Sequence, residues 1–263
     1  MCQKETLKQQ IAAMGIRSND TLLIHSSCRS VGPVEGGADT ILDAFSESLA
    51  DGLLIFPTHT WNVVKPGVPF DPAETPSCNG ILTELFRHRP GVIRSLHPTH
   101  SVAALGRDAA AYTAGEDQAQ TPCPRNGCWG KLYDRDAKIL FLGCGIRYNT
   151  FLHSVEEWAD IPDRLAGEPV ELHIKMPDGS LKPVSFYGHH SSFGDVSATF
   201  GKLELPMLQL KTLTFGYIGD APSFVMRARD VADLTLDYLK RDPNLFGHWE
   251  PVPAGWYRGK ETT

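Results

Sequence analysis

The stretches TLLIH at residues 21–25, GLLIFP at 52–57 and KILFLGCGI at 138–146 decide the fold class of this chain. Each is a short apolar run bounded by Gly, Pro or other turn-forming residues, which is the pattern of a buried strand. Residues 4–14 and 41–49 show the three- and four-residue apolar spacing of amphipathic helices. The order helix, strand, helix, strand predicts an α/β sheet covered by helices.

The rest of the chain extends this pattern. We expect helices at 81–86 and 148–159, strands at 101–106 and 214–219, and a last helix capped by Asp230. Residues 169–187 differ, because PVELHIKM alternates apolar and polar residues, Pro-Asp-Gly-Ser turns the chain, and LKPVSFY runs back. This pattern predicts a β-hairpin with one exposed face. No repeat or linker divides the sequence, so we expect a single domain over residues 1–263.

Composition excludes several classes of protein. The 263 residues include 25 Lys and Arg against 31 Asp and Glu, for a net charge of −6, and 41% are hydrophobic. Such a chain is not disordered, and its acidity does not suit nucleic acid, although it would suit a polycationic small molecule. No apolar stretch approaches the roughly 18 residues that span a bilayer, and the first ten residues lack the apolar core of a signal peptide. We therefore expect a cytoplasmic protein.

The six cysteines predict reduced thiols rather than disulfides, because the chain is neither short nor recognisably secreted. Cys123 and Cys128 lie in a Pro/Gly loop, but no second pair of ligands has the spacing of a zinc site, and we expect no metal. Cys28 lies three residues from His25, yet nothing supplies the third, orienting group of a Cys–His nucleophile.

Three polar segments lie at the ends of predicted strands, where α/β folds bind ligands. HSSCRSVG at 25–32 offers hydroxyls, an Arg and backbone N–H groups that suit a phosphate, unless it is an ordinary Ser/Gly turn. PTHT at 57–60 and HPTHS at 97–101 are candidate polar walls, and alternation would put His97, Thr99 and Ser101 on one side. Residues 61–78 contain four prolines and little periodicity, which is typical of a lid or a cleft wall.

A fourth segment, NTFLHSVEE at 149–157, is the most informative. On a helix, Asn149, His153 and either Glu156 or Glu157 lie on adjacent turns of one side. A carboxylate beside an imidazole fixes its tautomer and favours its protonated form, so His153 could act as a general base. The alternative is a solvated pair on a surface helix. The acidic side of this helix would also suit a cationic substrate.

In order and rough spacing, these four segments resemble the aminoglycoside 3-N-acetyltransferase (antibiotic N-acetyltransferase) family. GYIGDAPSFVMRARDVADLTLDYL at 216–239 resembles the C-terminal segment of that family. The resemblance covers about residues 5 to 240. It implies a three-layer α/β/α sandwich with a mixed sheet, acetyl-CoA as donor and a homodimer. It also implies direct transfer, without an acyl-enzyme, to the 3-amino group of the deoxystreptamine ring of aminoglycosides, which would confer antibiotic resistance.

The motifs and the resemblance together assign roles to individual residues. The family pattern Asn-Thr-x-x-His-x-x-Glu prefers Glu156 over Glu157 as the partner of the base. The expected catalytic residues are His153, Glu156, His25 and Thr150. The residues expected to bind the cofactor are Ser26, Ser27, Arg29, Ser30, Val31, Gly32 and Ser101. The residues expected to bind the acceptor are Thr58, Thr60, Asn149, Glu157 and His97.

Three other interpretations stay open at the level of sequence. A related acetyltransferase could act on an amine that is not an aminoglycoside. A protein that binds CoA or a nucleotide without catalysis would share the same loops. A metal-dependent hydrolase would need a ligand set drawn from His97, His100, His153 and Glu156.

Overall fold

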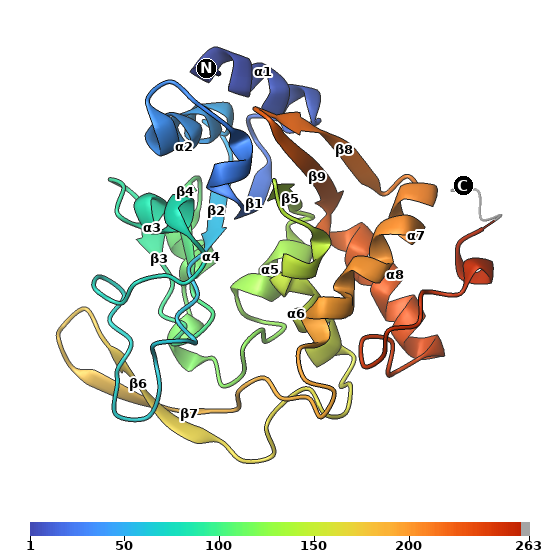
Figure 1. The fold of residues 1–263 in the computed structure, drawn as a ribbon. Coiled ribbons are helices and arrows are strands. Elements are labelled where there is room, and N and C mark those ends of the chain that lie inside the picture. The colour runs from blue at the N-terminus through green and yellow to red at the C-terminus, as the bar shows by residue number, and fades with distance from the viewer. Residues whose placement is uncertain (259–263) are drawn as a thin grey trace.

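A seven-stranded sheet runs through the computed structural model, which describes residues 1–258 (Figure 1). Its strand order is β3-β4-β2-β1-β5-β9-β8. β1 pairs in parallel with β2 and β5, and the remaining pairs are antiparallel, so the sheet is mixed. The strands are β1 (Thr21–Ser26), β2 (Leu53–Pro57), β3 (Ile93–Arg94), β4 (Val102–Gly106), β5 (Lys138–Leu142), β8 (Leu213–Ile218) and β9 (Ala221–Arg227).

Helices cover both faces of this sheet, because successive strand residues point to opposite sides. Leu22 and Ile24 pack beneath α1 (Lys4–Ala13), α2 (Gly37–Ser48) and α3 (Ile81–Arg87). Leu23 packs on the other side, whose helices are α4 (Ala109–Thr113), α5 (Cys128–Asp134), α6 (Thr150–Trp158), α7 (Glu204–Gln209) and α8 (Ala228–Arg241). The predicted α/β/α sandwich with a mixed sheet is therefore confirmed.

The predicted hairpin forms a second, two-stranded sheet of β6 (Val170–Lys175) and β7 (Leu181–Phe186). Figure 1 shows it below the main sheet, beside the loop that follows β2. Phe70 of that loop bridges Ile174 of β6. Together they bury a small core of their own, made of Val64, Phe70, Leu172, Ile174, Val184 and Phe186. The proline-rich loop and the hairpin thus form one wall.

Some local expectations were wrong or incomplete. Strand β9 and helices α4, α5 and α7 carried too little apolar periodicity to be predicted. The last helix begins at Ala228 with Arg227 at its N-cap, so Asp230 lies in the first turn rather than at the cap. Residues 97–100 form a tight turn, in which the His97 ring accepts the N–H groups of Thr99 and His100. The proposed strand alternation from His97 to Ser101 therefore does not apply.

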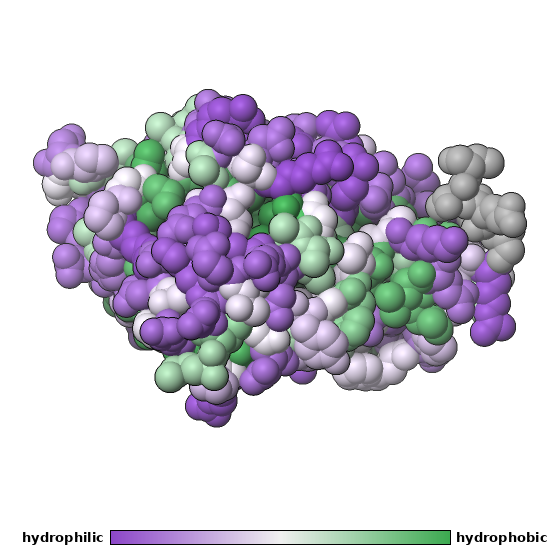
Figure 2. Space-filling model, turned by 90° about the horizontal axis from the view of Figure 1, so that it is seen from above, coloured by the Kyte–Doolittle hydropathy of each residue, from purple (hydrophilic) through white to green (hydrophobic). Residues whose placement is uncertain are grey.

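The surface seen in Figure 2 is largely hydrophilic over α1 and α2, and green, apolar surface gathers towards the side of α7. Leu205 and Leu208 of α7, and Phe215 and Tyr217 of the edge strand β8, are exposed. Within residues 1–258, no helix has both the length and the apolar character needed to cross a membrane.

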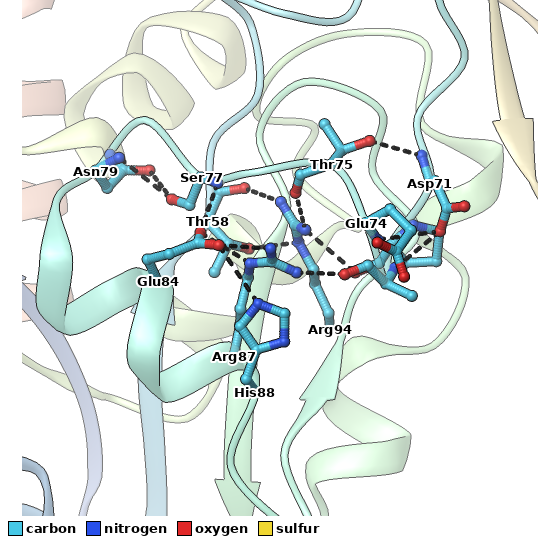
Figure 3. Close-up of polar contacts among 12 residues, drawn as sticks. Thr58, Asp71, Glu74, Thr75, Ser77, Asn79, Glu84, Arg87, His88 and Arg94 are labelled. Carbon is cyan, nitrogen blue, oxygen red and sulfur yellow. Dashed lines mark hydrogen bonds and ion pairs between the residues drawn. The ribbon is translucent and has the colours of Figure 1, made fainter. Parts of the chain in front are cut away.

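Arg94, at the end of β3, fastens the loop after β2 to the sheet (Figure 3). Its guanidinium donates to the carbonyls of Pro72 at 3.1 Å, Thr75 at 2.6 Å and Thr58 at 2.9 Å. Burial lowers the pKa of Arg94 to about 9, yet it stays protonated at neutral pH. Arg87 also holds this loop, because its Nη1 donates a hydrogen bond to the Ala73 carbonyl at 2.6 Å.

We predict that Arg94→Met destabilises the protein by about 3 kcal/mol, because partly buried carbonyls lose their donor. Urea denaturation at pH 7 measures this change. Arg107→Met is the matched control, since the Arg107 side chain is 64% exposed. An equal midpoint for wild type and Arg94→Met would contradict the role assigned to Arg94.

Candidate active site

Two adjoining cavities open where the parallel strands β1, β2 and β5 end. The larger cavity measures about 670 Å³ and the smaller about 540 Å³. Trp61, Asn79 and Tyr148 line both, so the two cavities meet at these side chains. Parallel strands deliver their C-terminal residues to one edge of the sheet, which explains why distant segments meet there.

His153 lines the larger cavity from α6, with Glu156 behind it. The helix buries Phe151, Leu152 and Val155 in the core, and this sets the rotation that turns His153 to the cavity. The Nδ1 atom of His153 lies 3.5 Å from Oε2 of Glu156, whose side chain is only 1% exposed. The buried Oε2 faces this nitrogen and has no hydrogen-bond partner among residues 1–258, so it can accept a hydrogen bond from Nδ1–H. The solvated surface pair is thereby excluded.

Arg164 neutralises this buried carboxylate. Its Nε donates to Oε1 of Glu156 at 2.5 Å, and its Nη1 donates to the carbonyl of Asp163 at 3.1 Å. Arg164 also lines the larger cavity, and its buried Nη2 has no partner among residues 1–258. Sequence reasoning missed this residue because it lies in an irregular loop, eight positions from Glu156, with no motif around it.

Glu157 lies away from both cavities, contrary to its expected contact with the acceptor. Its carboxylate accepts the N–H of Cys123 at 2.8 Å and the hydroxyl of Thr121 at 2.7 Å. Burial raises the pKa of Glu157 to about 7. Glu157 therefore fixes the loop at 121–123. Neither carboxylate of this helix faces the larger cavity, so the acidic helix side expected to attract a cation is not available.

The other histidines of the site form a packed group of rings. Ring centroids lie 4.3 Å apart between His153 and His189, 5.0 Å between His189 and His100, and 4.7 Å between His100 and His59. Burial lowers the pKa of His59 and of His100 well below the usual range. These two rings are therefore neutral at pH 7 and serve as hydrogen-bonding groups rather than charges.

His25 and His97 have separate roles. His25 is the last residue but one of β1, stacks on Phe141 with ring centroids 5.2 Å apart, and lines the smaller cavity. Burial lowers the pKa of His25 to about 3.

His97 lines neither cavity. Both of its ring nitrogens form hydrogen bonds with the backbone, and Nε2 bonds to the Thr121 carbonyl at 2.9 Å. Burial lowers the pKa of His97 to about 4. The structure thus places His97 as a support for the turn rather than in contact with the acceptor.

The remaining predicted residues divide into those at the cavities and those behind them. Asn149 and Thr150 line the larger cavity, and the buried Oδ1 of Asn149 has no partner within residues 1–258. Ser26 and Ser27 line the smaller cavity.

The second group supports the cavity walls. The hydroxyls of Thr58 and Ser101 bond to each other at 2.9 Å, and Thr60 donates to the Pro98 carbonyl at 2.6 Å. Arg29, Ser30, Val31 and Gly32 lie in and just after the short 3₁₀ helix Cys28–Val31, beyond the lining of the smaller cavity.

The proline-rich loop is the cleft wall that its composition indicated. Trp61, Lys65 and Pro66 line the larger cavity, and Cys78 lines the smaller. Asn79, at its end, was missed by sequence reasoning, as was Tyr148. His59 lies in the PTHT segment at 57–60, of which only Thr58 and Thr60 are among the expected site residues.

One group of side chains has the composition of a metal site. Ligand atoms of Cys123, Glu157 and His189 lie within 4.8 Å of one another in the described part of the chain. Both Glu157 oxygens already accept hydrogen bonds from Thr121 and Cys123. His97, one ligand of the hydrolase interpretation, has no free ring nitrogen.

The lining of the larger cavity has an unexpected charge pattern. Its cationic side chains are Lys65, Arg147 and Arg164, and Asp195 is its only carboxylate among the described residues. Asp195 lies 4.0 Å from Arg147. Much of the remaining wall is apolar: Trp61, Pro66, Pro122, Val170, Leu172, Phe186, Val196 and Phe200.

Comparison with known proteins places this site in a family. The family model described as aminoglycoside 3-N-acetyltransferase matches residues 23–240, which include all four segments. The chain belongs to the aminoglycoside 3-N-acetyltransferase family. As a member of this family it is an acyltransferase. The family resemblance seen in the sequence is confirmed.

Relatives of this family match over nearly the whole chain. Aminoglycoside N(3)-acetyltransferase IV of Salmonella sp is 30% identical, over 97% of this chain and 94% of its own. A histidine-to-alanine mutant of aminoglycoside acetyltransferase AAC(3)-IVa, solved in complex with a gentamicin, is 27% identical with a TM-score of 0.82, over 96% and 92% of the two chains. AAC-IIIb, solved with CoASH, is 25% identical with a TM-score of 0.81, over 96% and 99%.

We predict that Glu157 makes the stability of the protein depend on pH. Its folded pKa of about 7 lies above the ordinary value of 4.5. As the pH rises, Glu157 ionises in the unfolded chain before it ionises in the folded protein. The free energy of unfolding therefore falls progressively from about pH 4.5 to pH 7, and this loss is complete above pH 7. In Glu157→Gln the fall between pH 5 and pH 8 should be smaller by on the order of 1 kcal/mol.

Urea denaturation at pH 5 and pH 8 measures this difference. Glu171→Gln, on an exposed carboxylate, is the control and should titrate like the wild type. An unchanged pH dependence in Glu157→Gln would contradict the prediction.

Proposed function

We propose that this protein is an acetyl-CoA-dependent N-acetyltransferase that acetylates the 3-amino group of aminoglycosides by direct transfer, with His153 as general base. The observation that supports it best is the arrangement of His153 in the larger cavity. Glu156 orients this ring from behind, and a second cavity joins the first beside Asn79 and Tyr148. Two joined cavities suit two substrates that react with each other.

The smaller cavity is the proposed site for the thioester end of acetyl-CoA. His25, Ser26 and Ser27 line it, and the exposed Arg29 follows on the same loop, where it could meet the phosphates. A solved relative with the same fold binds CoASH, which supports CoA as the cofactor.

The larger cavity is the proposed site for the acceptor amine. An ammonium group entering it has to lose a proton before its nitrogen can attack. The neutral nitrogen then forms a bond to the thioester carbon, and His153 takes the second proton as the bond forms. When the C–S bond breaks, that proton ends on the CoA thiol. The balance is one amide, one CoASH and one proton released to solvent.

The other expected catalytic residues have defined places in this scheme. Burial lowers the pKa of His25 to about 3, so it faces the sulfur as a neutral ring that can donate a hydrogen bond but not act as a strong acid. Thr150 lies one turn before His153 in the larger cavity. Resistance to aminoglycosides, a cytoplasmic location and a homodimer complete the proposal through the family resemblance.

We predict that the wild type converts a deoxystreptamine aminoglycoside and acetyl-CoA to a mono-acetylated product, detected by mass spectrometry, with fragmentation placing the acetyl group at the 3-amino position. In His153→Ala, kcat should fall by about 100-fold or more, because proton transfer by a positioned side chain contributes about that much. CoA should still bind.

His88→Ala is the control, since His88 is exposed and lies outside both cavities. Wild-type turnover in His153→Ala would refute the role of His153. A wild type that acetylates no amine, while it still binds CoA, would refute the proposed function.

The charge pattern of the larger cavity favours a second candidate acceptor, an amine that carries an anionic group. Arg164 is paired with Glu156 and Arg147 lies 4.0 Å from Asp195, so Lys65 is the cation of this lining with no ion-pair partner given among residues 1–258, and it would attract an anion. The unpartnered Nη2 of Arg164 is a free donor, among residues 1–258, for a carboxylate or phosphate oxygen.

We predict that kcat/KM for glucosamine 6-phosphate exceeds that for glucosamine by about 10-fold if this second acceptor class is right, a difference of about 1.4 kcal/mol. Arg147→Glu should abolish this preference and raise kcat/KM for an aminoglycoside. Arg107→Glu, outside the cavities, should change neither value. A wild type that prefers the aminoglycoside to both amino sugars would contradict the second class and favour the first.

A further inference from the structure

His59 is a buried residue at the meeting point of the two cavities. It follows β2, its side chain is 4% exposed, and it lines the larger cavity. Its neighbour Asn79 lines both cavities. The Nε2 atom of His59 is buried without a hydrogen-bond partner among residues 1–258. An unsatisfied buried polar atom costs about 1–3 kcal/mol, so its presence calls for an explanation.

The contacts of Asn79 determine which nitrogen of His59 holds the proton. The backbone N–H of His59 donates to Oδ1 of Asn79 at 2.6 Å. Because that N–H can only donate, Oδ1 must face it, and the amide Nδ2 must face Nδ1 of the His59 ring at 3.3 Å. An amide NH₂ can only donate. Nδ1 of His59 is therefore the acceptor, and the ring proton is on Nε2.

The same contacts keep the His59 ring neutral. An imidazolium would bring an Nδ1–H against the Asn79 NH₂ group, and two donors repel each other. Burial also lowers the pKa of His59 well below its usual range. The ring packs against His100 at 4.7 Å and Trp129 at 5.5 Å, which hold it in place. His59 thus carries one fixed, neutral N–H donor, which is buried and unpartnered among residues 1–258, in the wall of the larger cavity.

No other buried histidine of the site, within the described chain, has this combination. His97 uses Nε2 on the Thr121 carbonyl and Nδ1 on two backbone N–H groups. Nδ1 of His100 contacts the hydroxyl of Thr99. His25 also has an unpartnered Nε2, but no hydrogen bond given for its ring among residues 1–258 fixes its tautomer.

We propose that His59 is a catalytic residue whose Nε2–H donates a hydrogen bond to the thioester carbonyl oxygen as that oxygen becomes an oxyanion. This inference rests on the proposed acetyl transfer. A fixed donor that needs no reorganisation stabilises a developing charge more than it stabilises the ground state. The thioester has to lie where the cavities meet, and Asn79 ties His59 to that point.

In the reaction His59 keeps its proton throughout. As the amine nitrogen bonds to the carbonyl carbon, the π electrons move to the oxygen, which accepts the Nε2–H hydrogen bond. When the C–S bond breaks, those electrons return to form the amide carbonyl. The proton removed from nitrogen passes through His153 to the CoA thiolate, so no further reactant is needed.

The kinetic test compares His59→Ala and His59→Gln with the wild type, with acetyl-CoA and the best acceptor found. We expect His59→Ala to lower kcat by about 100- to 1000-fold with both KM values near those of the wild type. His59→Gln should recover part of the loss, because its amide supplies a donor. His173→Ala, on the hairpin and outside both cavities, is the control.

The tautomer is tested separately by ¹⁵N NMR of the histidine side chains. We expect His59 to be neutral with its proton on Nε2 from pH 5 to pH 9, like His97, which serves as the internal reference. In Asn79→Asp the carboxylate cannot donate to Nδ1, so the proton should move to Nδ1, and kcat should fall as in His59→Ala.

The outcomes separate the two proposals. Wild-type kcat in His59→Ala, or a proton on Nδ1 in the wild type, would overturn the role of His59 while acetyl transfer stands. A wild type that acetylates no amine would overturn the proposed function itself.

Discussion

The parallel pairing of β1 with β2 and β5 is the constraint on which the site depends. Thr21 pairs with Leu53 and His25 with Phe141, so these three strands end at the same edge of the sheet. The loops after them are therefore neighbours, although they come from distant parts of the sequence. His25, His59 and the segment leading into α6 reach one place for this reason. Helices on both faces bury the strands and leave only that edge for ligands.

Burial then decides the chemistry of each polar group at this edge. Glu156 is buried with Arg164 and faces Nδ1 of His153, so its charge is not exposed to solvent or substrate. An ion pair of this kind adds little to stability, but loss of one partner would leave a buried charge. His25, His59 and His100 are desolvated without a carboxylate and stay neutral. The Glu156–Arg164 ion pair lies among these neutral rings, and in the proposed reaction it distinguishes His153, the proton acceptor, from His59, the hydrogen-bond donor.

The sequence predicted those parts of the fold and site that depend on local pattern. Apolar runs predicted β1, β2 and β5, and helical spacing placed His153 and Glu156 together. The choice of Glu156 needed the family resemblance, since Glu157 is equally near in sequence and bonds instead to Cys123. Arg164 and Asn79 act across loops whose paths no periodicity encodes. The sequence did not predict β9, because Pro222 and Ser223 interrupt its apolar pattern.

The residues of the proposed reaction are held by the packed sheet and helix, whereas charged residues of the larger cavity lie outside them. The acceptor of such a site can therefore change while its reaction stays the same. His153, Glu156 and His59 lie on a core-packed helix or just after a strand, where a shift would disturb the packing of the sandwich. Of the charged groups of the larger cavity, Lys65 lies on the loop after β2, next to Val64 of the small hairpin core, and Asp195 lies at the N-cap of the 3₁₀ helix Val196–Leu203. Substitutions there alter charge without repacking the sheet, so acceptor preference can diverge faster than the chemistry of acetyl transfer.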